Sequence, residues 1–325
     1  MPNATPRRPH LPLALLALLA PGGSGAAAIT RADEPSYQRI EDVIYGRKFG
    51  TALTMDVFQP KTGRNGLGVV AVVSGGWVSS HEAINPRSLA HWTDRGYTVF
   101  AVVHGSQPKF TIPEAIADLN RAVRFVRSHA NDYAINPDQV GIFGASAGGH
   151  LSLMQATAGD NGRPDANDPV DRASSRVQAI ACFYPPTDFL NYGKPGEEAI
   201  GTGTLVNFAA PFDFRDYDPA RKMFVTVTDP GKIREIARQV SPINHVSADD
   251  PPTLIIHGDA DKLVPIQQAE ILVAKLKAAN VPGELIVKPG LAHGWPNLDA
   301  DMKQFIDFFD RTLKVQFGGD SPVPR

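Results

Sequence analysis

From about residue 36 onward, short apolar runs alternate with segments whose apolar residues recur at steps of three and four. This alternation is expected when parallel strands are joined by crossover helices. Several of the apolar runs are rich in Val and Ile throughout, as strands buried on both faces must be. We therefore predict an α/β fold with a mostly parallel central sheet of about eight strands and helices on both faces. The expected strands are residues 40–45, 53–58, 68–73, 98–103, 139–143, 177–184, 253–257 and 284–287.

Amphipathic stripes predict three of the helices, at residues 113–126, 269–276 and 302–313. Residues 188–248 break the rhythm with many glycines and prolines, and we interpret them as a lid-like insertion in one domain that spans residues 36–315. Within the insertion we expect a strand at 223–228 and a helix at 232–240. Its aromatic residues would either shape a substrate pocket or form a small core of their own. They are Phe208, Phe212, Phe214 and Tyr217.

Composition narrows the class of protein. The chain has 325 residues, of which 42% are hydrophobic and 20% are charged, a balance suited to a folded domain. Lys and Arg (32) nearly cancel Asp and Glu (34) without a basic cluster, so we expect no nucleic-acid partner. The single cysteine, Cys182, cannot form an intramolecular disulfide, and the histidines lack the i, i+4 spacing of a helical metal site. We predict neither a metal nor any other cofactor, and the oligomeric state stays open.

The two ends of the chain carry a different pattern. An arginine pair precedes an apolar run over residues 11–20, and small residues follow up to Ala28. This is the order of a secretory signal peptide, so we expect residues 1–28 to be removed and the protein to be exported to the periplasm or the medium. The alternative is an uncleaved anchor helix, but the run is well short of the ~20 apolar residues that span a bilayer. Residues 316–325 are expected to form a loose tail.

The strongest local signal is the run Gly144-Ala145-Ser146-Ala147-Gly148, which directly follows one expected strand and precedes a helix-like segment. In this context small flanking residues let the chain pass through a strained turn that exposes the serine oxygen. The amino end of the following helix also favours developing negative charge. We therefore predict that Ser146 is a nucleophile. The alternative is a glycine turn in which Ser146 caps the helix.

A serine nucleophile needs a base, and the base needs an orienting acid. In this architecture they follow in the order serine, acid, histidine. Asp261 lies just past one expected strand and is the predicted acid, whereas Asp259 in the tight turn before it is expected to bond the loop backbone. His293 follows the last expected strand in a loop with two glycines and is the predicted base. The histidines set aside because of their positions are His81, His104, His129, His150, His245 and His257.

The tetrahedral intermediate of acyl transfer needs amide donors for its oxyanion. The amide of Ala147, the residue after the nucleophile, is the first predicted donor. The second is expected from the loop after the third strand, where Gly75 and Gly76 allow close approach of backbone N–H groups. The alternative for this glycine pair is a turn needed only for packing. Trp77 and Trp295, next to this loop and to the base, are expected to contact substrate.

With these motifs the chain resembles the α/β-hydrolase superfamily, and within it the group of bacterial acetyl- and feruloyl-esterase-like (BD-FAE-like) proteins. The matching segments, within residues 40–313, are Gly75 to Trp77, Asp118 to Phe125, Gly144 to His150, Pro251 to Asp261, Val264-Pro265 and His293 to Trp295. The resemblance implies an α/β-hydrolase fold with the triad and the oxyanion donors at the positions given above. In one departure, Val73 and Ser74 replace the leading histidine and the first glycine of the family's His-Gly-Gly-Gly-Trp loop. This departure removes the side-chain hydrogen bonds that usually brace the loop and leaves its backbone donors in place.

The resemblance implies a serine hydrolase that cleaves carboxylic esters, a short-acyl carboxylesterase acting on acetyl or feruloyl groups of a carbohydrate. Two alternatives stay open. One is a serine peptidase of the prolyl-oligopeptidase type, which shares the catalytic order, although too few residues precede the third strand to form the gating propeller of that type. The other is a non-catalytic binding protein on a hydrolase fold.

Overall fold

The structure of the protein, a computed structural model, describes residues 34–314. The predicted signal peptide and the predicted tail lie outside these residues, so both stay predictions. No helix in the described part of the chain is long and apolar enough to span a membrane.

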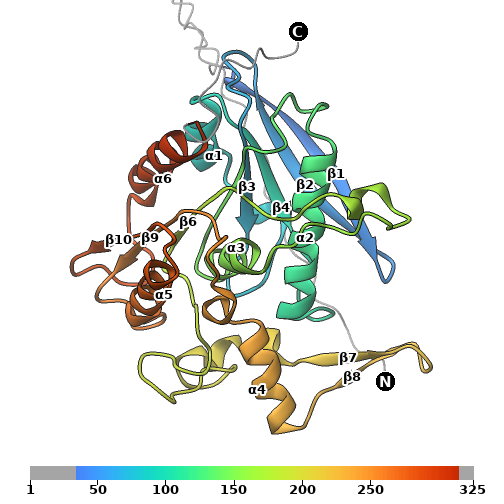
Figure 1. Cartoon of the computed structure of the whole chain (residues 1–325), viewed down its shortest axis with the longest axis vertical. Helices are drawn as coiled ribbons and strands as arrows, with labels where there is room; N and C mark the ends of the chain where they lie inside the picture. The colour runs from blue at the N-terminus through green and yellow to red at the C-terminus, as the bar shows by residue number, and fades with distance from the viewer. Residues whose placement is uncertain (1–33, 315–325) are drawn as a thin grey trace, which may run out of the picture. The chain divides into compact units, whose positions relative to one another are not determined.

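Eight strands form one mixed sheet in the order β1-β2-β4-β3-β5-β6-β9-β10 (Figure 1). The first two, β1 (Tyr37–Lys48) and β2 (Thr51–Pro60), form an antiparallel hairpin, and β2 pairs antiparallel with β4 (Thr98–Val103). All other neighbours in the sheet pair in parallel. The remaining strands are β3 (Gly68–Val73), β5 (Val140–Ala145), β6 (Ala179–Phe183), β9 (Thr253–Gly258) and β10 (Gly283–Lys288). Each expected strand of the sheet is present, and the α/β prediction is confirmed.

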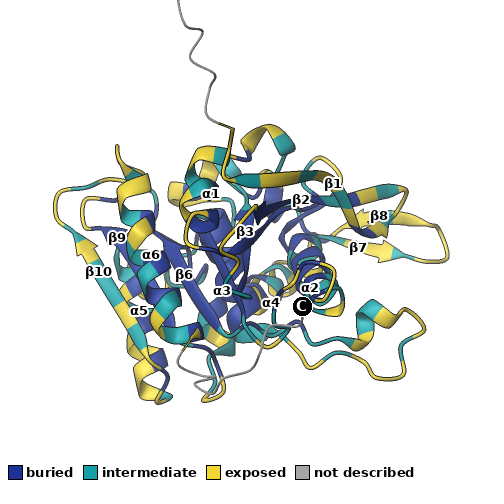
Figure 2. Cartoon of the chain, turned by 90° about the horizontal axis from the view of Figure 1, so that it is seen from above, coloured by how far each residue is buried: buried dark blue, intermediate teal, exposed yellow. Residues whose placement is uncertain are grey.

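Helices cover both faces of this sheet. They are α1 (Pro86–Thr93), α2 (Ile112–Ser128), α3 (Ala147–Ala158), α5 (Gln267–Ala278) and α6 (Leu298–Leu313). Successive residues of β3 point to opposite faces. Val69 and Ala71 belong to one apolar cluster with residues of α1 and α6, whereas Val70 and Val72 belong to another with residues of α2, α3 and α5. Two apolar layers therefore enclose the sheet, and its central strands form the buried centre in Figure 2, whereas the edge strands β1 and β10 are more exposed.

The three helices predicted from amphipathic stripes are α2, α5 and α6. Helix α1 was not anticipated, because its 8 residues give too short a stripe. Its start nevertheless has a clear signal, since the side chain of Asn85 accepts a hydrogen bond from the amide of Arg87 and Pro86 opens the first turn. Two short 3-10 turns, η1 (His81–Ala83) and η2 (Pro169–Arg172), lie in loops.

Between β6 and β9, the predicted insertion contains short elements. They are η3 (Gly203–Phe208), η4 (Ala210–Phe212), β7 (Arg215–Asp218), β8 (Met223–Thr226), α4 (Pro230–Gln239) and η5 (Pro242–His245). The strand and helix expected there correspond to β8 and α4. Phe212 is buried and packs against Phe214 and against Trp77 of the main domain. The insertion is therefore anchored by aromatic packing, while its β7–β8 hairpin carries exposed side chains (Figure 2).

Candidate active site

The predicted nucleophile turn, residues 144–148, which we call the elbow, lies where β5 passes into α3. Ser146 has φ 53° and ψ −119°, a strained backbone conformation for a residue with a side chain. A Cβ on Gly144 would lie 2.4 Å from the carbonyl oxygen of Gly148, and one on Gly148 would lie 2.8 Å from that of Val72. The close passage of strand and helix therefore requires both glycines. Ser146 makes no capping hydrogen bond, so the alternative of a simple helix cap is not what the structure shows.

Three predicted residues meet at the carboxyl ends of the parallel strands. Nε2 of His293 lies 2.9 Å from Oγ of Ser146, and Nδ1 of His293 lies 2.7 Å from Oδ2 of Asp261. Three different loops supply them, since Asp261 follows β9 and His293 lies between β10 and α6. Asp261 is buried, whereas Ser146 and the side chain of His293 are partly exposed. This is the geometry of a hydrogen-bonded nucleophile, base and acid.

Asp261 is held by its own turn. Its Oδ1 atom accepts hydrogen bonds from the amides of Leu263 and Val264, both at 2.9 Å. Burial alone would raise the pKa of Asp261, but hydrogen bonds from His257 and His293 outweigh it and hold this pKa well below its ordinary value. The carboxylate therefore stays ionised, as it must to orient an imidazole.

Asp259, the other carboxylate after β9, accepts a hydrogen bond from the backbone of a neighbouring loop. Oδ1 of Asp259 accepts a hydrogen bond from the amide of Gly290 at 2.6 Å. A Cβ on Gly258 would lie 2.1 Å from the carbonyl oxygen of Leu291, so the two loops pass very close to each other. Asp259 thus ties the turn of the acid to the loop that carries His293, in line with the backbone role expected for it.

Two further residues contact this series: His257, which the sequence analysis set aside as a base because of its position, and Tyr184, which it missed. His257 is buried, with Nε2 at 2.8 Å from the carbonyl of Val264 and 3.4 Å from Oδ2 of Asp261, and its Nδ1 has no partner within residues 34–314. The ring of Tyr184 lies 4.5 Å from that of His293. Burial, helped by the charge of Asp261, raises the pKa of Tyr184 to about 12, so its phenol stays neutral. Tyr184 directly follows β6, and this place at the carboxyl end of a strand is the sequence signal that could have found it.

The loop after β3 offers fewer free amides than its two glycines suggest. The amide of Gly75 donates to the carbonyl of Val78 at 3.0 Å, and the amide of Val78 returns a bond of the same length. The prediction that Gly75 donates to an oxyanion is therefore corrected, because its N–H is already used. The amide of Gly76 has no partner among the described residues, and Ala147, as the first residue of α3, has an amide outside the helical pattern. These two amides remain as the predicted donors.

Both tryptophans that were expected to contact substrate donate their indole N–H to another side chain of the protein. Trp77 is only 4% exposed and donates from Nε1 to Nδ1 of His150 at 3.0 Å. The substrate prediction for Trp77 is therefore wrong, because packing buries its ring. Trp295 donates from Nε1 to Asp301 at 2.7 Å and packs against Phe183. It remains partly exposed, so its contact with substrate stays a prediction.

His150 joins the loop after β3 to the insertion. Its Nδ1 accepts from Trp77, so Nε2 carries the proton and donates to the carbonyl of Val240, 2.6 Å away at the end of α4. Burial lowers the pKa of His150 to about 4 despite the bond to Val240, so the ring is neutral at neutral pH. The insertion therefore holds Trp77 in place through one imidazole.

One group in the described part of the chain has the donor types of a metal site. Atoms of Asp42, Asp56 and His81 lie within 4.8 Å of one another. Asp56 is already paired with Arg39, however, and Nε2 of His81 lies 2.7 Å from the hydroxyl of Thr54. The group is accounted for as a hydrogen-bonded link between β1, β2 and η1. The prediction that no metal or cofactor is used stays a prediction.

A mostly parallel sheet that carries a serine on a strand-to-helix elbow, followed along the chain by an acid and a histidine, defines the α/β-hydrolase class. Within this class the chain belongs to the BD-FAE family, whose model matches residues 55–276. The resemblance noted from the motifs is thereby confirmed.

Individual relatives agree with this assignment. The chain is 29% identical over 245 residues to the probable carboxylic ester hydrolase LipM of Mycobacterium tuberculosis, a match covering 74% of this chain and 52% of LipM. It is 24% identical over 232 residues to an acetylxylan esterase of Xylanibacter ruminicola, covering 71% and 41% of the two chains. A solved carbohydrate esterase from gut microbiota, in truncated form, has a TM-score of 0.69 and 26% identity, covering 86% of this chain and 98% of that one. The chain spans about half the length of the first curated relatives it matches.

Proposed function

We propose that the protein hydrolyses carboxylic esters through an acyl-enzyme formed on Ser146. The observation that carries this proposal is the unbroken hydrogen-bonded series from Ser146 through His293 to Asp261. Membership of the BD-FAE family and similarity to a probable carboxylic ester hydrolase and an acetylxylan esterase support the same reaction. A binding protein without catalysis would not need a serine held in a strained conformation against a partly exposed imidazole.

In the first step, His293 takes the proton of Ser146 while Oγ forms a bond to the carbonyl carbon of the ester. The amides of Gly76 and Ala147 stabilise the resulting oxyanion, each by about 2.7–4 kcal/mol in the transition state. The bond to the alcohol then breaks, and His293 gives its proton to the departing oxygen. In the second step, water gives a proton to His293 and attacks the acyl carbon. Release of the carboxylic acid returns that proton to Ser146.

For the acyl group, we infer a place in an apolar cavity of about 410 Å³ beside the elbow. Its walls include Gly75, Ala145 next to Ser146, and Leu298 and Met302 of α6. Neither Ser146 nor His293 lines this cavity, but Gly144 and Ala145 of the elbow do. Its apolar walls suit an acyl chain that extends away from Ser146 better than an alcohol that must stay within reach of the base. Its volume exceeds that of an acetyl group and has room for an aromatic acyl group such as feruloyl.

For the alcohol, we infer a carbohydrate. The support is the similarity to an acetylxylan esterase and to a solved carbohydrate esterase. We also propose that the protein acts after export, in the periplasm or the medium, because residues 1–28 have the pattern of a signal peptide.

We propose that the insertion forms one side of the substrate entrance. Gly76 has φ 56°, and a Cβ there would lie 2.6 Å from the ring of Phe208, so η3 contacts the loop after β3 directly. The carbonyl of Val240, at the other end of the insertion, reaches the same loop through His150 and Trp77. Movement of the insertion would therefore act on the amide of Gly76.

The test is hydrolysis of para-nitrophenyl esters, from acetyl to long acyl chains, by the full chain and by Ser146→Ala. We expect activity that falls for long chains and is lost by at least about 10⁴-fold in the variant. Ser128→Ala, at an exposed hydroxyl on α2, is the matched control and should keep full activity. A fluorophosphonate should label the wild type on Ser146 and leave Ser146→Ala unlabelled.

Two results would contradict the proposal. Activity that survives Ser146→Ala would show that the nucleophile lies elsewhere. A protein that cleaves proline-linked amides but none of the esters would be a peptidase of the alternative type.

A further inference from the structure

A histidine outside the catalytic series contacts the loop that carries the predicted oxyanion donor. His104 directly follows β4 and is 3% exposed, and its Nε2 lies 2.9 Å from Oγ of Ser74. Ser74 opens the segment that leads through Gly76 to Trp77, which we call the oxyanion loop (residues 74–77). No histidine occurs in residues 73–77 themselves. The fold therefore brings an imidazole to this loop from the neighbouring strand.

The direction of this hydrogen bond follows from the other ring nitrogen. Nδ1 of His104 lies 2.8 Å from the carbonyl oxygen of Gly105, which can only accept, so Nδ1 carries the proton. Burial lowers the pKa of His104 to about 4 despite this bond, and the ring is neutral at neutral pH. Nε2 must then accept, and the hydroxyl of Ser74 donates to it. The side chain of Ser74 is thus turned toward β4.

On its carboxyl side, His104 is anchored to α2. The amide of Gly105 donates to Oδ2 of Asp118 at 2.8 Å, and the same oxygen pairs with Lys48 at 2.7 Å. A Cβ on Gly105 would lie 2.7 Å from the ring of Phe110 and 3.1 Å from Asp118. The chain can therefore approach Asp118 this closely only with a glycine after His104.

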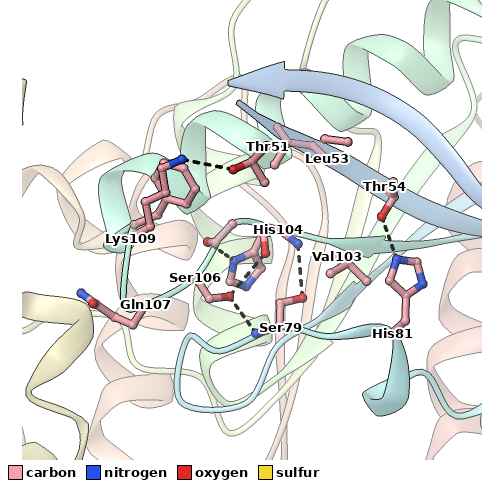
Figure 3. Close-up of a pocket in the computed structure, with 13 residues that line it drawn as sticks. Thr51, Leu53, Thr54, Ser79, His81, Val103, His104, Ser106, Gln107 and Lys109 are labelled. Atoms are coloured by element: carbon pink, nitrogen blue, oxygen red, sulfur yellow. Dashed lines mark hydrogen bonds between the residues drawn. The ribbon is translucent and has the colours of Figure 1, made fainter. Parts of the chain in front are cut away.

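On its other side, His104 is tied back to the start of the oxyanion loop. Its amide donates to Oγ of Ser79 at 3.2 Å, and the hydroxyl of Ser79 donates to the carbonyl of Val73. The amide of Ser79 in turn donates to Oγ of Ser106 at 2.9 Å. Figure 3 shows His104 with Ser79 and Ser106 in the wall of a pocket of about 420 Å³. His104 therefore occupies a fixed position from which it can hold Ser74.

We propose that His104 is a positioning residue of the reaction, which through Ser74 holds the oxyanion loop so that the amide of Gly76 faces the oxyanion. The inference rests on the proposed function. Trp77 and His150 hold the other end of the loop, so two neutral imidazoles fix this short segment. Releasing one end lets the amide of Gly76 move, and the lost stabilisation exists only in the transition state.

The test compares Ser74→Ala, His104→Ala and the double variant with the wild-type full chain on para-nitrophenyl acetate. We expect each single variant to lower kcat about 10-fold and to change KM by less than about 2-fold. The double variant should lose no more than the worse single variant, because both changes break the same hydrogen bond. Labelling of Ser146 by a fluorophosphonate should slow in parallel, since phosphonylation uses the same amides.

Conservative variants separate positioning from folding. Ser74→Thr keeps the hydroxyl and His104→Gln keeps an acceptor, so both should recover most of kcat. His129→Ala, a histidine at the end of α2 away from the loop, is the control and should leave kcat unchanged. Thermal melting by circular dichroism checks the fold of each variant. If His104→Ala does not fold, Ser74→Ala carries the test, because Ser74 is partly exposed.

The outcomes distinguish this inference from the proposed function. Unchanged kcat in Ser74→Ala, or losses that add in the double variant, would overturn the role of His104 and leave the esterase proposal standing. A wild-type protein that neither hydrolyses esters nor takes the label would overturn the proposed function and this inference with it.

Discussion

Two segments are proposed to supply the two amides of one oxyanion site: the elbow, residues 144–148, and the oxyanion loop, residues 74–77. They are held in place in different ways. The elbow is held by its own backbone, because its glycines permit a close passage that no other residue allows. The oxyanion loop has one backbone bridge, between Gly75 and Val78, and its side chains are held from outside, by the buried rings of His104 after β4 and His150 of α3.

This difference shows which parts of a site a local motif can encode. A steric requirement within one turn must appear in the residues of that turn. Side chains that hold a loop by hydrogen bonds can come from any neighbouring helix or strand. A loop without a bracing residue of its own can therefore be held by a residue of a neighbouring element. We therefore expect substitutions in the turns that hold themselves, such as the elbow, to lower kcat strongly. Substitutions of the side chains that hold the oxyanion loop should lower kcat less.

The largest effect is expected at Asp261, which is held by its own turn, as the elbow is. Asp261→Asn keeps the shape of the acid but stabilises the wrong tautomer of His293, so we expect kcat to fall about 10⁴-fold. The measurement is steady-state hydrolysis of para-nitrophenyl acetate, with active-site titration to count competent molecules. A loss of less than about 10-fold would move the role of acid to another residue.

The same variant gives a test of pH dependence. The pKa of Asp261 in the folded protein is held below its ordinary value, so folding favours the ionised carboxylate. This stabilisation is present above the ordinary Asp pKa of about 3.9 and is lost as the pH falls below it. The difference in melting temperature between wild type and Asp261→Asn should therefore be largest near neutral pH and shrink below about pH 4. A difference that grows on acidification would contradict this account.

One substitution made at two glycines compares the elbow and the loop directly. In Gly144→Ala the new Cβ would lie 2.4 Å from the carbonyl oxygen of Gly148, so the elbow must shift. We expect kcat to fall about 100-fold and the melting temperature to drop by several degrees. In Gly75→Ala the new Cβ meets nothing within 4 Å, and kcat should stay within about 3-fold of wild type. An equal loss of kcat in the two variants would contradict the distinction between the elbow and the oxyanion loop.

A smaller effect is expected at the brace of Trp77. Trp77→Phe removes the indole N–H and leaves Nδ1 of His150 buried without a partner, which should lower the free energy of unfolding by about 1–3 kcal/mol. We expect kcat to fall about 5-fold, because the oxyanion loop loses one of the two imidazoles that hold its side chains. Trp92→Phe is the matched control, since the buried Nε1 of Trp92 has no partner in the described residues. It should alter stability through packing and leave kcat unchanged; an equal fall in both variants would argue against the brace.

The smallest effect is expected at the β7–β8 hairpin. Met223 is 45% exposed there, and Met223→Ser should change the free energy of unfolding by less than about 0.5 kcal/mol and kcat by less than about 2-fold. Urea unfolding and steady-state kinetics measure the two quantities. A clear loss of activity would show that the outward side of the insertion also acts on the oxyanion loop.

Much of the fold could be predicted because burial leaves a periodic trace. Strands β3 and β4 lie at the expected residues, since apolar runs buried on both faces have sharp ends. Helix α1 was missed because only three of its residues are buried, which is too few for a recognisable stripe. The insertion was recognised as irregular, but its anchoring through Phe212 depends on contact with Trp77, which lies far away in the sequence.

The site residues also fall into those that the sequence could predict and those that it could not. Ser146, Asp261 and His293 each follow a strand of a parallel sheet, and the shared edge of such a sheet brings them together. Gly75 was assigned wrongly because its bridge with Val78 depends on how the loop folds back. Trp77 was assigned wrongly because nothing in the local sequence shows that His150 and the insertion bury it.

The sequence by itself therefore determined the α/β fold and the elbow, and it predicted a nucleophile, an acid and a base in that order, because periodic burial and tight turns are properties of neighbouring residues. Tertiary structure alone decided which amides stay free and what holds them. His104 and Ser74 are 30 positions apart, and their hydrogen bond exists because β4 lies beside β3 in the sheet. Contacts of this kind depend on strand order, which single-sequence patterns do not contain.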